Sequence, residues 1–299
     1  VLNRTHPAAD YAGGMVTTPL SISIQRAVQV AETLPAAPRV LAELQVLLQD
    51  PNNGLDEVAE VLRHDMGLTS RVIRIANGVM FNKGDPVGSL EEALVRVGFN
   101  EVYRLAGLAA LAQLASFELA FYGVSAARLR ENALLVGLLM EELAFVVGED
   151  ARIAYTVGLM RPASRIVLDA TAQKDLKGLK PTPIGTKALH VWERDTFGIV
   201  GRDVGAAVLK AWRFPAEVFV PIRDHHLQGL AVDPVPMAKV LHVAATLAEM
   251  RGFALPGETG YWEAEAEKAA DAVGLTQDLA DAAGDRSMAR FEQLRALLN

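Results

Sequence analysis

One short segment holds side chains that could bind a metal ion: Asp224, His225 and His226. A carboxylate and neutral imidazole rings are ordinary ligands for transition metals. Consecutive residues on a helix, however, project about 100° apart, so the two rings cannot easily share one ion. We therefore favour a structural interpretation, in which one histidine caps or packs against a helix end and the other is solvated. A residual metal site is the alternative.

The other candidate residues form no comparable set. His64, His190 and His242 are isolated in helical context, so we expect them to have core or surface roles. The chain has no cysteine, which excludes disulfides, thiolate metal sites, iron–sulfur clusters and cysteine nucleophiles. It also has neither a Gly-Lys-Ser/Thr phosphate loop nor a GxGxxG pattern. The sequence gives no reason to expect a cofactor.

Composition and charge narrow the class of protein. Hydrophobic residues make up 51% of the 299 residues and aromatic residues only 6%, so a core must consist mainly of aliphatic side chains. The net charge of −7 argues against non-specific binding to nucleic acid, which depends on neutralising phosphates. The apolar stretch Leu105–Phe121 is interrupted by Gln113 and Glu118, so we expect a buried helix there rather than a membrane span.

The elements that must position these residues are helices. From about residue 21, apolar residues recur at helical spacing with almost no strand alternation, which predicts an all-α protein. Ser89 to Glu92 has the spacing of a capping box, and Gly98 stands where a glycine would close that helix. Helices are predicted over 100–121 and 125–147. A third, over 151–171, contains Pro162, which should kink or restart it.

Several segments of the chain, taken in order, resemble elements of one family of helical domains. LPAAP (34–38) resembles the opening of these domains, and HDMGLTSRVIRIANGVMF (64–81) resembles their DPALTARLLRLANSAFY element. VGSLEEALVRVGFNEV (87–102) is similar to the following helix. TFGIVGRDVGAAVLKAWRFP (196–215) is similar to a later element, and His225-His226 falls where a paired histidine commonly occurs. Together these segments resemble the HDOD family, whose domains are output modules related to HD hydrolases. The resemblance runs from about residue 34 to residue 226.

The resemblance implies a two-part helical bundle. We expect a tail or linker over residues 1–20, an N-terminal helical bundle over 21–123 and a degenerate HD-like helical part over 124–230. A C-terminal helical extension over 231–299 should pack on the HD-like part.

The resemblance also implies that the metal chemistry is lost. HD hydrolases hold their metal with a histidine, a consecutive His-Asp pair and a distal aspartate. GLMRPASRIVL (158–168) resembles the segment GLLHDIGKLVL, but Arg161 takes the place of the histidine and Pro162 that of the aspartate. Neither side chain can ligate a metal. The upstream histidine maps near Glu131, and Gly201 falls where the family often has a histidine.

The family alignment would bring Arg161, Arg165, Arg223, His225 and His226 around the old metal pocket. Such a cationic pocket would suit a phosphate or nucleotide anion, which guanidinium binds in bidentate fashion. We favour the other interpretation, in which Arg161 is held in a buried ion pair by a carboxylate, with Glu131 the leading candidate.

The expected function is that of a non-catalytic bacterial signal-transduction module, cytoplasmic and without membrane contact, that acts on an unknown signalling protein. The first alternative is a sensor that binds a nucleotide or another anion in the degenerate pocket. A divergent phosphohydrolase is less favoured, because its metal ligands are missing.

Overall fold

The computed structural model describes residues 21–35, 37–47, 53–78, 84–175, 183–185, 187–227, 230, 232–258, 260 and 263–295. The predicted tail, residues 1–20, lies outside these ranges. The helices in chain order are α1 (Ile24–Ala31), α2 (Ala37–Leu47), α3 (Leu55–Arg63), α4 (Met66–Ala76), α5 (Leu90–Val97), α6 (Phe99–Leu114), α7 (Ala126–Val147), α8 (Ala151–Met160), α9 (Ala163–Asp175), α10 (Leu189–Phe197), α11 (Gly201–Ala211), α12 (Ala216–Asp224), α13 (Pro236–Met250), α14 (Glu263–Ala272) and α15 (Gln277–Leu294). In the described residues the sole β feature is an isolated bridge between Leu119 and Val124, so the all-α prediction is confirmed.

Local sequence signals set several helix ends. The hydroxyl of Ser89 accepts a hydrogen bond from the backbone N–H of Glu92, as the predicted capping box requires. The carboxylate of Glu92 accepts from Gly88, one residue before the cap. Gly98, with φ of 83°, ends α5 in a conformation that favours glycine. Pro162 separates α8 from α9, so the predicted break is confirmed.

The helix predicted over 100–121 is shorter than expected. It ends at Leu114, and the chain then turns through a segment closed by the bridge between Leu119 and Val124. Gly123, with φ of 64°, makes the turn that leads into α7. No helix within the described residues combines the length and apolarity needed to cross a bilayer.

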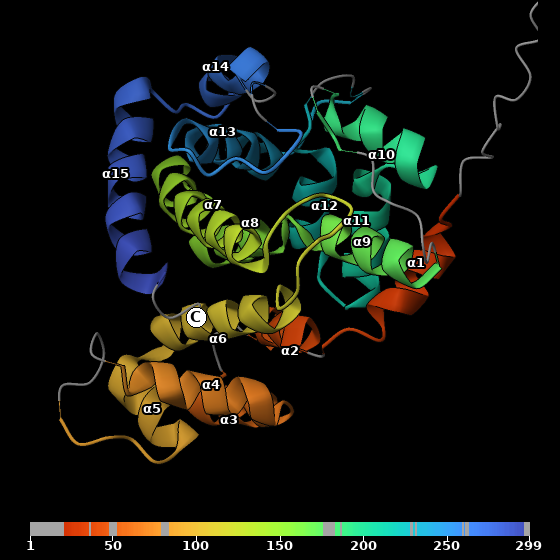
Figure 1. Ribbon diagram of the computed structural model, residues 1–299. Helices are drawn as coiled ribbons and strands as arrows, with labels where there is room; N and C mark the ends of the chain where they lie inside the picture. Colours follow the sequence, from red (N-terminus) through yellow and green to blue (C-terminus); the bar gives the residue numbers. More distant parts are fainter. Residues whose placement is uncertain are drawn as a thin grey trace, which may run out of the picture.

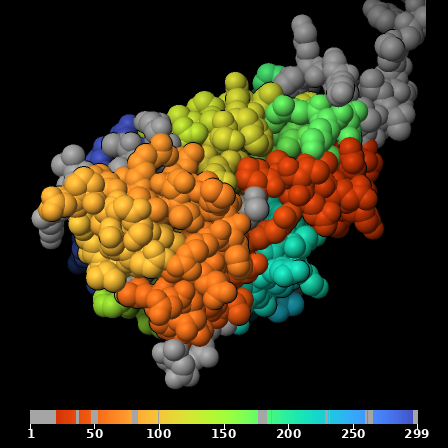
Figure 2. All heavy atoms as spheres, turned by 90° about the horizontal axis from the view of Figure 1, so that it is seen from below, coloured from red at the N-terminus to blue at the C-terminus, as the bar shows by residue number. Residues whose placement is uncertain are grey.

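The helices are arranged around α7 and α8, which lie side by side at the centre of the molecule (Figure 1). Helix α6 lies below this pair, with α3, α4 and α5 beneath it. Helix α13 packs against α7 from above, and α15 packs against it at the left of the view. Seen from below, α3 to α6 form one continuous lobe (Figure 2). Helix α1, which we assigned to the N-terminal bundle, instead packs on α9 and α11 in the second part of the chain.

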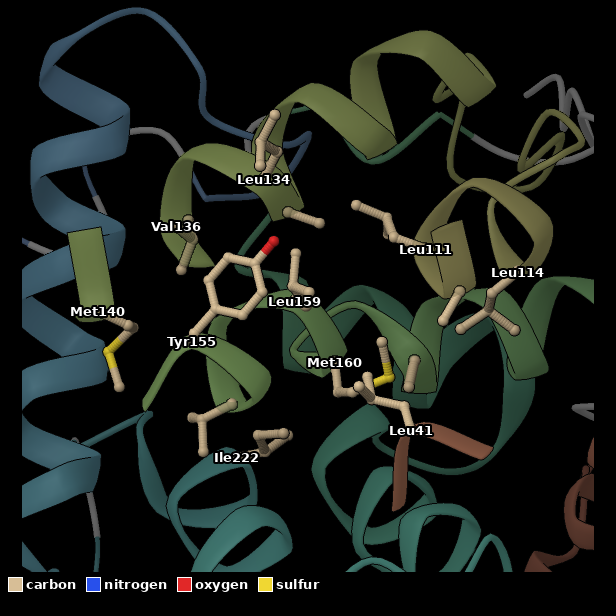
Figure 3. Close-up of a cluster of buried hydrophobic side chains, with 14 of the residues drawn as sticks. Leu41, Leu111, Leu114, Leu134, Val136, Met140, Tyr155, Leu159, Met160 and Ile222 are labelled. Carbon is tan, nitrogen blue, oxygen red and sulfur yellow. The ribbon is translucent and has the colours of Figure 1, made fainter. Parts of the chain in front are cut away.

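The core where α2, α6, α7 and α8 meet is mainly aliphatic, as the composition predicts (Figure 3). Tyr155 is buried there and its hydroxyl donates a hydrogen bond to the carbonyl of Arg104 at 3.2 Å. Gly158 permits the close crossing of α7 and α8, because a Cβ at that position would stand 2.5 Å from the Cα of Gly137. This tight packing fixes the end of α8, where the candidate site begins.

Candidate functional site

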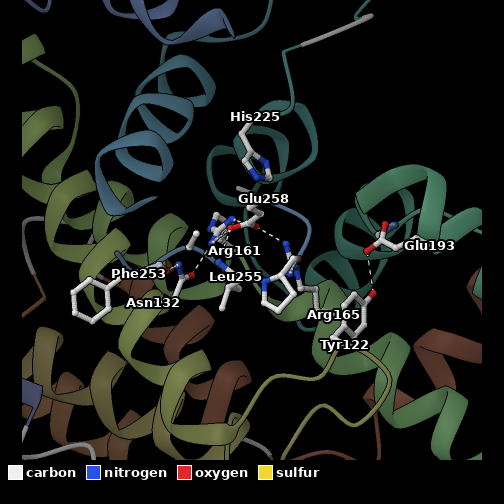
Figure 4. Close-up of polar contacts among 12 residues, drawn as sticks. Tyr122, Asn132, Arg161, Arg165, Glu193, His225, Phe253, Leu255 and Glu258 are labelled. Atoms are coloured by element: carbon white, nitrogen blue, oxygen red, sulfur yellow. Dashed lines mark hydrogen bonds and ion pairs between the residues drawn. The ribbon is translucent and has the colours of Figure 1, made fainter. Parts of the chain in front are cut away.

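A buried ion cluster joins Arg161, Arg165 and Glu258 (Figure 4). Arg161 directly follows α8, Arg165 lies on α9, and Glu258 lies between α13 and α14. The Nη1 atom of Arg161 lies 2.6 Å from Oε1 of Glu258, and Nη2 of Arg165 donates to the same oxygen. All three residues are buried, with exposed fractions of 6%, 4% and 2%. Two guanidinium groups therefore share one carboxylate.

Further hydrogen bonds hold the cluster in place. The Nη2 atom of Arg161 donates to Oδ1 of Asn132 on α7 at 2.6 Å. Arg165 donates to the carbonyl of Pro256 at 3.0 Å, and the N–H of Leu255 donates to Glu258 at 3.3 Å. Burial alone would raise the pKa of Glu258, but the charges of Arg161 and Arg165 outweigh that effect and lower it to about 2. Glu258 is therefore ionised at neutral pH.

His225 and His226 lie beside this cluster, with ring centroids 4.2 Å apart. His225 ends α12 and its Nδ1 lies 2.7 Å from the carbonyl of Ile222, so the prediction that one histidine packs at a helix end is confirmed. The prediction that the other is solvated is wrong, because His226 is partly buried and lines the same cavity. Burial is the main cause that lowers the pKa of His225 well below its usual value, and His226 and Arg161 lower it further. Burial likewise lowers the pKa of His226 to about 3.

A second buried carboxylate, Glu193, closes the opposite wall. It accepts hydrogen bonds from the hydroxyl of Tyr122 at 2.9 Å and from the backbone N–H of Gly201 at 2.6 Å. Burial raises the pKa of Glu193. A Cβ at position 201 would stand 2.8 Å from Oε1 of Glu193, so the histidine that the family often has there would not fit without displacing this carboxylate.

Two of the residues predicted for this pocket lie elsewhere. Glu131 pairs with Arg295 at 3.2 Å and does not reach Arg161; its neighbour Asn132 does. The resemblance therefore predicted the position on α7 with an error of one residue. One residue along a helix changes the direction of a side chain by about 100°, which turns Glu131 away from Arg161. Arg223 is exposed and pairs with Asp224 at 2.7 Å, so it does not line the cavity.

Sequence reasoning missed Glu258 and Glu193, which contribute the carboxylates of the site. Glu258 lies outside the segment that resembles the family, in a connection without periodicity, so no local pattern marks it. Glu193 lies on α10 among other polar residues, and its burial follows only from the tertiary packing.

The cavity between these residues has a volume of about 30 Å³. Sites for small ligands usually have about 300–1,000 Å³, so this one has room for little more than water. The metal of the HD hydrolases does not fit the residues present. The carboxylate of Glu258 already forms ion pairs with two guanidinium groups. In the described part of the chain, no group of three or more His, Asp or Glu residues is arranged to hold a metal ion.

Comparison with known proteins places this geometry in a family. Residues 34–228 match the HDOD domain. An HDOD domain protein of unknown function from Geobacter sulfurreducens has a similar structure, with a TM-score of 0.65, 18% identity, and coverage of 93% of this chain and 99% of that one. A protein from Marinobacter aquaeolei VT8, provisionally assigned to signal transduction, gives a TM-score of 0.65 with 20% identity over 89% of this chain and 59% of that one. A provisionally assigned phosphohydrolase from Shewanella amazonensis SB2B gives 0.59 with 20% identity, over 92% and 98% of the two chains.

One curated relative is longer than this chain. An uncharacterised protein of Treponema pallidum (strain Nichols) is 25% identical over 261 residues, which is 82% of this chain and 46% of the relative. The chain thus spans about half the length of the curated relative it matches. Because the family match covers 34–228 and the solved HDOD structure shares the fold over most of both chains, this chain belongs to the HDOD domain family.

Proposed function

We propose that this protein is a non-catalytic regulatory module of bacterial signal transduction that acts through contacts with protein partners in the cytoplasm. The observation that carries the proposal is the ion cluster of Arg161, Arg165 and Glu258. By the resemblance, Arg161 takes the place of a residue with which HD hydrolases hold their metal ion. The provisional assignment of the Marinobacter protein to signal transduction supports the regulatory part of the proposal.

The chemistry of the cluster argues against hydrolysis. A phosphoester hydrolase needs an activated water and a cation that offsets charge on the phosphate. The arginines could supply positive charge, but Glu258 contacts both guanidinium groups and offsets one of their two charges. A guanidinium also cannot act as a base at accessible pH. His225 and His226 are held neutral, yet the cavity beside them is too small for a phosphoester substrate.

The alternative of an anion sensor in this same pocket is less well supported. An incoming phosphate would have to displace Glu258, which is 2% exposed and is bound by both arginines. The chain itself provides a carboxylate that both guanidinium groups already contact. The pocket is therefore better suited to hold α8, α9 and the C-terminal extension together than to receive a ligand.

Two measurements test the proposal. The purified protein is assayed with bis-p-nitrophenyl phosphate and with cyclic dinucleotides, in the presence of Mg²⁺, Mn²⁺ and Fe²⁺. We expect no turnover above that of the Glu258→Gln variant. Crosslinking in the native host, followed by reconstitution with the recovered protein, should give a complex of defined stoichiometry. Metal-dependent turnover by the wild type that the variant lacks would overturn the non-catalytic assignment.

A further inference from the structure

An open hollow on the N-terminal lobe is lined by two arginines that pair with no carboxylate of the described residues. It has a volume of about 360 Å³ and is lined by Gly67, Ser70, Arg71, Arg74 and Gln113. We call this set the arginine hollow. It lies away from the cluster of Arg161 and Glu258, and none of its residues lines that buried cavity.

The hollow is built on one face of α4. Residues 67, 70, 71 and 74 are spaced at i, i+3, i+4 and i+7, which places them along one side of a helix. Helix α6 contributes Gln113, whose amide nitrogen lies 3.3 Å from where a Cβ at Gly67 would stand. The missing side chain at Gly67 therefore leaves room beside an amide that can donate hydrogen bonds.

A third arginine, Arg130 on α7, lies near the arginine hollow. Figure 1 shows α6 between α4 and α7, and Arg130 reaches across to donate from Nη1 to the carbonyl of Ala115 at 2.8 Å. Its Nε atom is buried and has no hydrogen-bond partner among the described residues. Burial lowers the pKa of Arg71, and the charges of Arg74 and Arg130 lower it further. Arg71 therefore lies close enough to Arg74 and to Arg130 to be repelled by each of them.

Several other arginines in the described part of the chain pair with carboxylates. Arg63 pairs with Glu91, Arg104 with Glu141, and Arg161 with Glu258. In the described part of the chain, neither Arg71 nor Arg74 forms an ion pair or a side-chain hydrogen bond. The acid beside Gly67, Asp65, is used as the cap of α4, where it accepts from the N–H of Leu68 at 2.9 Å. A protein with a net charge of −7 has many acids that could have paired with these arginines, yet this face leaves them uncompensated.

We propose that the arginine hollow binds a phosphate group carried by a small soluble ligand. A guanidinium presents two parallel N–H donors to an oxoanion, and Arg71 and Arg74 stand one turn apart on the same face. Ser70 and Gln113 add neutral donors beside them. The volume of about 360 Å³ is at the lower end of the range for small-molecule sites, which suits a phosphate with a modest attached group. This site is independent of the proposed function and does not involve Glu258.

The test is a titration by calorimetry at constant ionic strength. The probes are inorganic phosphate, pyrophosphate and AMP, with chloride as the reference anion; sedimentation with phosphatidylglycerol vesicles forms a separate arm. We expect saturable binding of at least one soluble phosphate probe by the wild type. Arg74→Gln and Arg71→Gln should each weaken that binding at least about tenfold, through the loss of a charge-assisted hydrogen bond. Arg63→Gln, which alters an exposed and paired arginine, should leave it unchanged.

Folding of the variants can be checked independently. Because Arg71 is repelled by its neighbours, Arg71→Gln should unfold at the same temperature as the ligand-free wild type or a higher one. Arg74→Lys keeps the charge but loses the two-pronged geometry, so it should bind more weakly than the wild type. The proposal is overturned if no soluble probe binds, if binding is unaffected in both glutamine variants, or if only vesicles bind.

Discussion

The guanidinium of Arg161 lies 2.6 Å from the carboxylate of Glu258, a residue 97 positions later in the chain. The contact ties the end of α8 to the connection between α13 and α14, and so joins the region that matches the HDOD family to the C-terminal extension. Arg165 binds the same carboxylate from α9. Folding of the family domain and docking of the extension are therefore coupled through one buried charge.

Removal of that charge should destabilise the protein strongly. Glu258→Gln keeps the shape of the side chain but removes the negative charge that two buried guanidinium groups contact. We expect a loss of about 3–5 kcal/mol in the free energy of unfolding, measured by urea denaturation. The matched control is Glu267→Gln, an exposed residue of the same extension, which should stay within about 0.5 kcal/mol of the wild type. Equal losses in the two variants would contradict the role of the cluster.

The partner of Arg161 can be identified by double-mutant cycles. Arg161→Ala combined with Glu258→Ala should show a coupling energy of about 0.5–3 kcal/mol, because the residues are in direct contact. The cycle of Arg161→Ala with Glu131→Ala should be additive, since Glu131 pairs with Arg295. A larger coupling to Glu131 than to Glu258 would refute the observed pairing.

The burial of Arg161 could be predicted from the sequence, but its partner could not. The family alignment places Arg161 at an inward position, and a charge there must be paired, so a carboxylate was expected and is found. Glu258 is far away in the sequence and lies in a turn that carries no repeating pattern. Only the tertiary fold brings that turn over α8 and α9.

Helix positions could be predicted more reliably than side-chain directions. The break at Pro162 and the cap at Ser89 depend on neighbouring residues, so the sequence alone identifies them. The choice between Glu131 and Asn132 depends on the rotation of α7, which periodicity cannot fix because most of that helix is buried on all sides. The sequence likewise does not show that Arg71 and Arg74 lack an ion pair among the described residues, because that depends on where the acidic side chains lie in the fold.

The crossing of α7 and α8 gives a prediction about packing. Gly158→Ala would place a methyl group 2.5 Å from the Cα of Gly137, and backbone cannot move aside as a side chain can. We expect destabilisation of about 1–3 kcal/mol or more, seen as a lower urea midpoint. Gly88→Ala serves as the control, because the atom nearest to a Cβ there is a side-chain oxygen of Glu92 at 4.0 Å, an ordinary contact distance. If the two variants unfold at the same urea concentration, the close crossing is not present in solution.

The two neutral histidines predict how stability depends on pH. The pKa of His226 is about 3 in the folded chain, against an ordinary value of 6.5, and that of His225 is also lowered well below 6.5. As pH falls below 6.5, the unfolded chain therefore binds protons that the folded chain does not. Stability is fully present above this pH and is lost below it, by about 1.4 kcal/mol per pH unit for each histidine once the unfolded chain is protonated.

Urea unfolding from pH 7.5 to pH 5 measures this slope. The carboxylate of Glu258, whose folded pKa of about 2 lies below the ordinary 4.5, starts to lose its contribution only near and below pH 4.5, so it adds little in this window. His226→Gln should reduce the slope by about one bound proton, which is about 1.4 kcal/mol per pH unit. If His226→Gln keeps the full slope of the wild type, then His226 is not held neutral beside Arg161 and Arg165, and the electrostatic description of the site is wrong.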